Sequence, residues 1–301
     1  MFHLAGLVKN IRDLEITGWY NEGYESFEEF LPPDDVIVYP TLDALFRYVD
    51  AVVVSHKNMT DVSSIIKCLK HFKHVFLTDA HCLKYDDFVY LEKIAEESNV
   101  IFYPEFGSIT SENVPGLLEN LKDLQYIDIN HTFSPNEGIC VNGRLSLALL
   151  RDLHFITDLV QANVKKVNAH GWGFCEPGAG MMNARIDFDN ASSANLLLAN
   201  SIKPRQLQVV LYGKSTITRI SAIDNIFKIN QESLSMGQIN DFEKILPADS
   251  GLKTELKLFV SSIQQMASGF RSVENKYKSI RIAHLVHEKI NHFASLNIFY
   301  S

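Results

Sequence analysis

The pattern of apolar and polar positions changes about two-fifths of the way along this 301-residue chain. Before residue 120, short continuous apolar runs alternate with stretches of helical periodicity. Residues 50–55 are the clearest such run, which is typical of a parallel strand buried on both faces. Strands are also predicted at 74–77 and 100–103, each after a predicted helix, at 61–72 and 85–97. This alternation with short connections predicts a parallel α/β sheet.

After residue 120 the apolar pattern predicts a different architecture. Residues 124–131 alternate as in a strand, and a helix is expected at about 144–161. Closely spaced strands separated by turn signals then favour an antiparallel sheet. These strands are expected near residues 165–173, 182–189, 193–200, 206–212 and 215–220. Helices at 252–269 and 273–292 complete the pattern, so we predict one domain over 1–120 and a second over 121–301.

The N-terminal segment lacks one element of the first domain. Residues 3–12 have helical periodicity and lead into a predicted strand at 14–20, but no strand and no G-x-G-x-x-G turn come before them. In nucleotide-binding α/β folds that turn lets the backbone approach a pyrophosphate. Two explanations are open: the true start lies upstream of Met1, or the element has been lost. The first is favoured because the missing strand should be central in the sheet.

Composition excludes several classes of function. The chain has 28 basic and 36 acidic residues, a net charge of −8, which argues against nucleic-acid binding and offers no basic face to a membrane. No apolar run reaches the roughly 18 residues that span a bilayer. The four cysteines are scattered without a C-x-x-C pair, so we expect reduced thiols in a cytoplasmic protein. They are Cys68, Cys82, Cys140 and Cys175.

The order of these elements, together with their residues, resembles a known family. The segments that carry the resemblance are 3–7, 15–21, 49–54, 73–77, 158–160, 163–167, 183–190, 255–260 and 273–280. None of them is diagnostic alone, but in this order and spacing they are similar to the glucose–fructose oxidoreductase/inositol dehydrogenase (Gfo/Idh/MocA) family over nearly the whole chain.

The resemblance implies a Rossmann domain that binds NAD or NADP, followed by an α+β domain with an open, mostly antiparallel sheet. It also implies hydride transfer between the nicotinamide and a small-molecule substrate that is a sugar, a polyol or a related carbonyl compound. The open sheet of such proteins commonly forms an oligomer interface, so a homo-oligomer is expected. No metal, nucleic acid or membrane is implied.

Four residues are candidates for cofactor binding. Asn21 stands where the family often has an acidic residue that holds the adenosine ribose, although it can equally serve to turn the chain. Ser55 and His56 follow the strand at 50–55, where the family often carries a Thr-Pro pair. Thr78 follows the strand at 74–77. The carboxyl ends of parallel strands are where such sheets bind ligands, although His56 is equally compatible with an exposed loop.

The largest departure from the family is at residues 78–80. The family signature there is Glu-Lys-Pro, and its Lys helps to bind substrate and often assists proton transfer. This chain has Thr78-Asp79-Ala80. A carboxylate cannot stabilise a developing alkoxide as an ammonium does, but Asp79 can act as a base.

The predicted helix at 144–161 carries the remaining catalytic candidates. The family helix offers an Asp and a His about one turn apart, and here His154 and Asp158 lie four residues apart on one helix face. An alignment anchored on Asp158 places Phe155 at the family's His position, whereas a shift of one residue brings in His154. The same pair can instead hold the helix against the first domain.

Two hypotheses about function therefore remain. The chain is either a divergent NAD(P)-dependent oxidoreductase that uses His154, Asp158 and Asp79, or a non-catalytic descendant that serves as a ligand-binding or oligomer-partner protein. Loss of both the glycine turn and the Lys gives weight to the second hypothesis.

Overall fold

The computed structural model divides the chain into two compact units. The first unit comprises residues 1–82, 86–105 and 252–273, and the second comprises 83–85, 106–251 and 274–301. The predicted boundary between residues 120 and 121 lies outside the described residues. The structure describes residues 11, 14–20, 36–55, 62–78, 80–106, 123–133, 146–172, 180–201, 205–223, 226–233, 236–245, 250–266 and 273–297.

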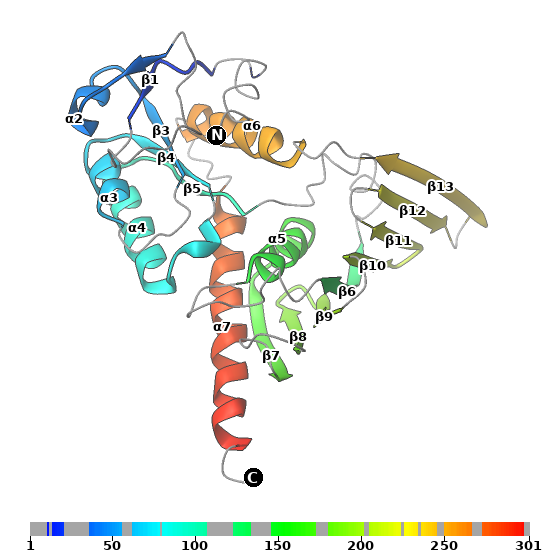
Figure 1. The fold of residues 1–301 in the computed structure, drawn as a ribbon. Coiled ribbons are helices and arrows are strands. Elements are labelled where there is room, and N and C mark those ends of the chain that lie inside the picture. The colour runs from blue at the N-terminus through cyan, green and yellow to red at the C-terminus, as the bar shows by residue number, and fades with distance from the viewer. Residues whose placement is uncertain are drawn as a thin grey trace. The chain divides into compact units, whose positions relative to one another are not determined.

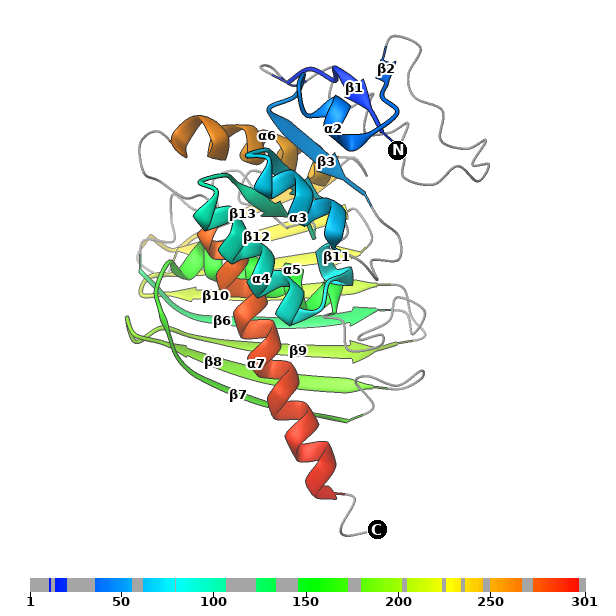
Figure 2. The same ribbon diagram turned by 90° about the vertical axis from the view of Figure 1, so that its left-hand side faces the viewer.

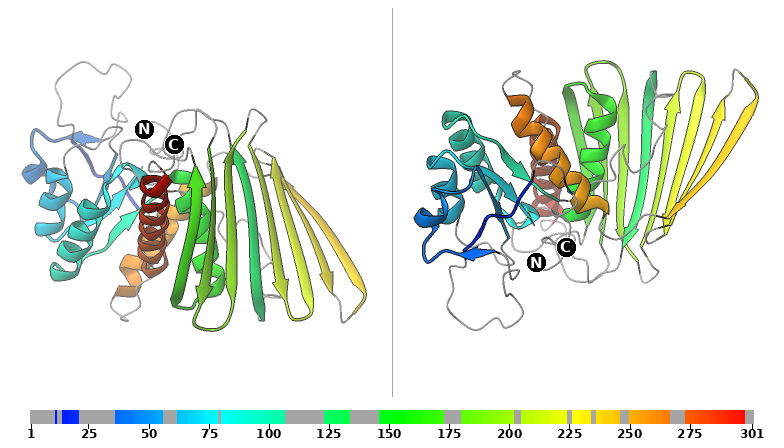
Figure 3. Two further views of the ribbon diagram at one scale, coloured as in Figure 1. Left: turned by 90° about the horizontal axis from the view of Figure 1, so that it is seen from below. Right: turned by 90° about the horizontal axis from the view of Figure 1, so that it is seen from above.

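The first unit contains a parallel sheet of three strands in the order β3-β4-β5. The strands are β3 (Ala51–Val54), β4 (His74–Leu77) and β5 (Phe102–Pro104). Helices α3 (Ser63–Lys70) and α4 (Tyr85–Glu97) connect them along the chain. Figures 1 and 3 show these two helices on one face of the sheet and α6 (Ser250–Gln265) on the other. The predicted parallel α/β sheet is confirmed.

Aromatic rings hold α6 to this sheet. Phe76 and Tyr103, on neighbouring strands, stack with ring centroids 5.4 Å apart, and Phe259 of α6 packs edge-on against both at 5.5 and 5.8 Å. The Tyr103 hydroxyl donates a hydrogen bond of 2.8 Å to the buried carboxylate of Glu255. A buried carboxylate needs such a donor because desolvation of an unpaired charge is costly. Burial also lowers the pKa of His74, whose Nδ1 accepts from the N–H of Ile101.

A separate pair of short parallel strands precedes this sheet. Strand β1 (Gly18–Trp19) pairs with β2 (Ile37–Val38), and α2 (Leu42–Leu45) follows. A Cβ atom at Gly18 would collide with the side chains of Leu45 and Tyr39, so glycine permits their close approach. The strand predicted over 14–20 is only two residues long in the structure. The helix predicted over 3–12 lies in residues that are not described.

The second unit is built on an eight-stranded sheet, which Figure 2 shows strand by strand. Its order is β13-β12-β11-β10-β6-β9-β8-β7, and among its neighbours only β6 and β9 run parallel. This confirms a mostly antiparallel sheet. The strands are β6 (Leu124–Phe133), β7 (Val164–Trp172), β8 (Met181–Phe188), β9 (Ser193–Asn200), β10 (Gln206–Gly213), β11 (Thr216–Ile223), β12 (Ile226–Ser233) and β13 (Gln238–Ile245).

Helices α5 (Leu147–Val160) and α7 (Glu274–Asn297) pack on one face of this sheet, as Figure 3 shows. Residues of that face, such as Ile129, Leu196 and Val209, are buried. The residues that alternate with them point to the other face, where no described helix packs, and we call this the open face. Four large apolar side chains are exposed on it: Trp172, Tyr212, Ile223 and Ile239.

The sequence pattern did not predict β12 and β13. Each strand carries only three apolar residues among mostly charged and amide side chains, so its alternation is weak. Their pairing with β11 supplies the backbone hydrogen bonds that local sequence does not specify. None of the described helices has a stretch long and apolar enough to cross a membrane. Cys68 and Cys82 are buried and form no disulfide in the described part of the chain, whereas Cys140 and Cys175 are not among the described residues.

Candidate active site

Helix α5 positions the predicted pair of His154 and Asp158. The Ser146 hydroxyl caps its N-terminus by accepting from the N–H of Leu149 at 3.3 Å, and the helix ends at Gln161 in a left-handed conformation. The spacing of four residues places both side chains on one face, as predicted. His154 Nε2 lies 3.5 Å from Asp158 Oδ2.

The Asp158 carboxylate is held by both of its oxygens. Asn275, in the first turn of α7, donates from Nδ2 to Asp158 Oδ1 at 3.0 Å, which leaves Oδ2 facing His154. The His154 side chain is 5% exposed, whereas that of Asp158 is 33% exposed. The carboxylate is therefore the part of the pair that a ligand can reach, and the imidazole supports it from the interior.

The ring of Phe106 packs against His154. The His154 ring meets it edge-on at 5.6 Å, and the ammonium of Lys276 lies 4.4 Å from its centroid. Arg151 Nε donates a 2.8 Å hydrogen bond to the Phe106 carbonyl. Lys276 follows Asn275 in α7, so two consecutive residues of that helix contact the surroundings of His154 and Asp158. The sequence did not reveal this because α7 is more than 110 residues away along the chain.

A second polar network lies on the opposite side of α5. Asp152 Oδ2 is 2.8 Å from His131 Nδ1 on β6, and Arg205 Nε donates to His131 Nε2 at 3.0 Å. A guanidinium can only donate and a carboxylate can only accept, so the imidazole between them is neutral and carries its proton on Nδ1. Both His131 and Asp152 are buried. Sequence reasoning missed this network, although its Asp lies in the helix segment it had selected.

Two predicted cofactor residues lie at the carboxyl ends of neighbouring parallel strands. Ser55 directly follows β3, and Thr78 directly follows β4. The Thr78 N–H and hydroxyl both donate to the Val54 carbonyl, at 3.0 and 3.4 Å, which joins the two strand ends. The structure thus brings the strand ends that carry Ser55 and Thr78 together. The other three predicted residues, Asn21, His56 and Asp79, are outside the described part of the chain.

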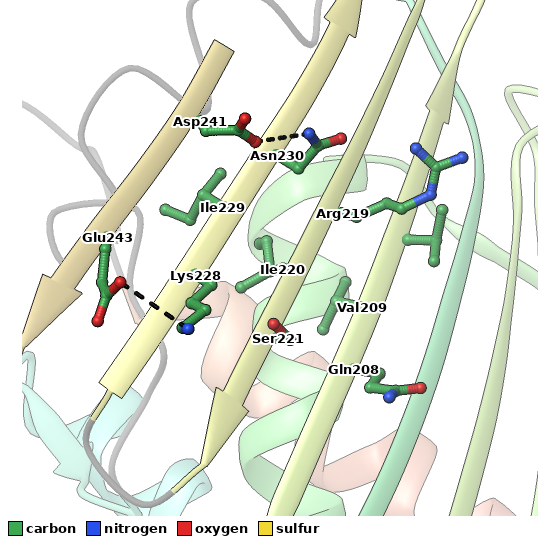
Figure 4. Close-up of a pocket in the computed structure, with 11 residues that line it drawn as sticks. Gln208, Val209, Arg219, Ile220, Ser221, Lys228, Ile229, Asn230, Asp241 and Glu243 are labelled. Atoms are coloured by element: carbon green, nitrogen blue, oxygen red, sulfur yellow. Dashed lines mark hydrogen bonds and ion pairs between the residues drawn. The ribbon is translucent and has the colours of Figure 1, made fainter. Parts of the chain in front are cut away.

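A hollow on the second unit's sheet contains none of these candidates. It has a volume of about 580 Å³ and lies over β10 to β13, as Figure 4 shows. Its charged side chains are satisfied within the sheet: Lys228 pairs with Glu243, Asn230 with Asp241, and Arg219 with Glu232. No group of three or more His, Cys, Asp or Glu side chains in the described ranges is arranged to hold a metal ion.

Comparison with known families shows what the first unit is related to. Residues 1–106 match the model of the GFO_IDH_MocA family, described as an oxidoreductase family with an NAD-binding Rossmann fold. The resemblance to the Gfo/Idh/MocA family is confirmed. The matched segment contains the parallel strands β3 to β5, so the fold of the first unit and its family agree. No curated protein sequence matches the chain significantly.

Solved structures show the same fold over nearly the whole chain. A dehydrogenase from Chromobacterium violaceum has a TM-score of 0.75 at 14% identity, covering 98% of this chain and 93% of that one. The UDP-N-acetylglucosamine 3-dehydrogenase GnnA from Acidithiobacillus ferrooxidans has a TM-score of 0.70 at 16% identity, covering 97% and 94%. Biliverdin reductase from Synechocystis sp. PCC 6803, in complex with biliverdin and NADP+, has a TM-score of 0.66 at 16% identity, covering 96% and 95%.

The polar side chains at the carboxyl ends of β3 and β4 can form hydrogen bonds with the uncharged polar groups of a nicotinamide nucleotide, the cofactor of the Gfo/Idh/MocA family. The Thr78 hydroxyl donates its hydrogen to Val54, and its oxygen can accept a hydrogen bond from a ribose hydroxyl or a carboxamide. Ser55 is exposed beside β3 and can both donate and accept. These are the hydrogen-bonding types that a nicotinamide nucleotide presents away from its phosphates.

Proposed function

We propose that this protein is an NAD(P)-dependent oxidoreductase that acts on a sugar, a polyol or a related carbonyl compound. The observation that carries the proposal is the match of residues 1–106 to an NAD-binding oxidoreductase family, on a unit with the expected parallel strands. The similar solved structures include a nucleotide-sugar dehydrogenase and a biliverdin reductase, which supports a small organic substrate. We propose a cytoplasmic location, as the scattered cysteines of the sequence predict.

The bound nicotinamide would supply the hydride, and the chain's own residues would bind, orient and move protons. Ser55 and Thr78 are proposed to hydrogen-bond the cofactor, together with Asn21 and His56. Asp158 is proposed to exchange a proton with the substrate oxygen, because it is the exposed member of its pair. His154 supports that exchange through its Nε2, since a buried imidazole can stabilise either protonation state of a neighbouring carboxylate.

Asn275 has a positioning role in this proposal. Its amide occupies Asp158 Oδ1 and so keeps Oδ2 directed at His154. Thr157 and Ser279 both donate to the Asn275 carbonyl, at 3.3 and 2.6 Å, which fixes the first turn of α7 against α5. A supporting shell of this kind is what holds reactive groups in a productive geometry.

The first test is a calorimetric titration of the 301-residue chain with NADH and, separately, with NADPH. We expect micromolar binding of one of them. Replacing Thr78 with Val is expected to weaken that binding about fivefold, because one hydrogen bond contributes about 1 kcal/mol. Thr132→Val on β6 serves as the matched control and should leave the affinity unchanged. If a well-folded chain binds neither nucleotide, the proposed oxidoreductase function is wrong for this chain.

We also propose that the protein forms a homo-oligomer through the open face. Trp172 and Ile239 on that face are 59% and 66% exposed, and Tyr212 and Ile223 add further apolar surface. These side chains are spread over the face from β7 to β13, and exposed aromatic and apolar residues among polar ones are typical of association sites. The mixture of these side chains with paired charges, such as Lys228 and Glu243, resembles the composition of protein interfaces.

The double variant Ile223→Asp/Ile239→Asp is expected to convert the oligomer into monomers in sedimentation velocity at micromolar concentration. Two buried carboxylates without partners would cost several kcal/mol at an interface. Phe72→Asp in the first unit is the control, since Phe72 is 71% exposed and is not part of the sheet that carries the open face. A wild-type chain that sediments as a monomer, or a double variant that remains oligomeric, would argue against the open face as the interface.

A further inference from the structure

A second, smaller hollow of about 360 Å³ lies in the second unit, where strands β7 and β8 approach the turn into β9. Its lining is mostly polar, with three basic residues and one acidic residue, and it contains none of the residues proposed for catalysis. The lining residues are Lys165, Lys166, Arg185, Asp187, Phe188, Ala191, Ser192 and Ser193.

A β-bulge explains why two consecutive lysines line one hollow. Successive residues of a regular strand point to opposite faces of the sheet. The register between β7 and β8 shifts between Val164 and Lys166, so Lys165 is an extra residue without a partner in the ladder. Bulges of this kind redirect a side chain and occur frequently next to functional sites. Here the bulge turns Lys165 towards the hollow that Lys166 also lines.

The charges around this hollow do not cancel. Three cationic side chains face one carboxylate, that of Asp187, which already accepts from Arg185 Nε at 3.0 Å. Arg185 Nη2 also donates to the Ser193 hydroxyl at 3.5 Å. Within the described ranges, neither Lys165 nor Lys166 has a carboxylate within ion-pair distance. The chain as a whole carries a net charge of −8, so this local excess of positive charge is unusual for it.

The larger hollow on the same sheet shows the contrasting case. There each charged side chain has a partner of opposite or neutral character, as Figure 4 shows for Lys228 with Glu243 and Asn230 with Asp241. A self-neutralised surface of that kind does not favour a small ion. Two neighbouring ammonium groups repel each other, and the single carboxylate of Asp187, which already accepts from Arg185, does not balance them, so an anion between them would relieve that repulsion.

We propose that the hollow lined by Lys165, Lys166 and Arg185 binds a phosphate group. The two ammonium groups supply charge and several donors, and the guanidinium beside them supplies further donors in a fixed plane. The Ser193 hydroxyl lies in the same lining, accepts from Arg185, and can donate its own hydrogen to a phosphate oxygen. The ligand is either inorganic phosphate or the phosphate of a small metabolite, and the hollow offers no aromatic side chain other than Phe188 for stacking.

The experiment is a titration of the whole chain with inorganic phosphate, followed by phosphorus NMR and calorimetry. Parallel titrations with glucose 6-phosphate and AMP, and with glucose and adenosine, separate free phosphate from a phosphorylated metabolite. Saturable binding of phosphate or of a phosphorylated compound is expected. The double variant Lys165→Gln/Lys166→Gln is expected to weaken it at least tenfold, because charge-assisted hydrogen bonds are the strong ones.

The matched control is Lys214→Gln/Lys228→Gln, which removes two exposed lysines that are paired with Asp123 and Glu243. If both double variants bind phosphate equally weakly, the overall charge of the chain explains the loss of affinity, and the proposal is wrong. Absence of saturable binding by the wild type would also overturn it. An affinity for phosphate that is unchanged in Lys165→Gln/Lys166→Gln would overturn it as well, because these two lysines would then not contact the ligand.

Discussion

Turnover by the His154→Ala variant is expected to fall about a hundredfold to ten-thousandfold, which is the usual contribution of a positioned proton-transfer group. His154 Nε2 lies 3.5 Å from the one-third-exposed carboxylate of Asp158, and the imidazole itself is only 5% exposed. The measurement is the rate of NAD+ or NADP+ reduction at saturating alcohol, with UDP-N-acetylglucosamine and myo-inositol as first substrates. Asp158→Asn should lose a similar amount.

The double variant His154→Ala/Asp158→Asn makes this prediction specific. Two residues that act as one unit give losses that do not add, so the double variant should be no slower than either single variant. His170→Ala, an exposed histidine on β7, is the matched control and should retain wild-type turnover. Additive losses, or an active His154→Ala enzyme that still folds, would assign the pair to packing between α5 and α7.

The Asp152→Ala variant is expected to lose about 3 kcal/mol of folding free energy, because removing one partner of a buried ionic network leaves the other groups buried without a partner. His131 would keep a buried Nδ1–H without its acceptor, and Arg205 would lose the carboxylate that balances its charge through the imidazole. Urea unfolding followed by circular dichroism measures this loss as a lower midpoint with an unchanged slope.

Two further variants separate this network from a general effect of losing a carboxylate. Asp152→Asn keeps an acceptor for the His131 N–H and should cost about 1 kcal/mol, the size of one ordinary hydrogen bond. Asp158→Ala removes the other Asp of the same helix, which is one-third exposed, and should cost less than about 1 kcal/mol. If Asp152→Ala is as stable as Asp158→Ala, the His131 network does not stabilise the second unit.

The strands and helices that the sequence predicted well are those whose burial is strong and regular. Strand β4 (His74–Leu77) is buried along its length, and helix α4 (Tyr85–Glu97) has one continuous apolar face, so both match the predicted ranges. Strand β9 (Ser193–Asn200) alternates cleanly and also matches. Strands β12 and β13 were missed because amide and charged residues interrupt their alternation. Their pairing with β11 comes from tertiary context, which local pattern does not contain.

The contacts of the candidate site are likewise of two kinds, those that the sequence predicted and those that only the structure shows. The spacing of His154 and Asp158 was sufficient to place them together, because residues four apart meet on any α-helix. The partners that act on them, Asn275 and Phe106, come from segments 117 and 48 residues away, by the differences 275 − 158 and 154 − 106. His131 and Arg205 likewise meet Asp152 only after β6 and β10 have paired. The periodicity of apolar residues along the chain does not predict such contacts between distant segments.

The amino-acid sequence by itself determined the alternation of strand and helix in the first unit, the change to closely spaced strands after it, and the family resemblance that the first 106 residues confirm. These follow from local burial patterns and from residue order. Only the tertiary structure decided the strand order of the eight-stranded sheet, the face of α5 that each polar residue occupies, and the bulge that gathers two lysines in one hollow. Each of these depends on backbone pairing or packing between distant segments, and that free energy is gained only when the segments meet.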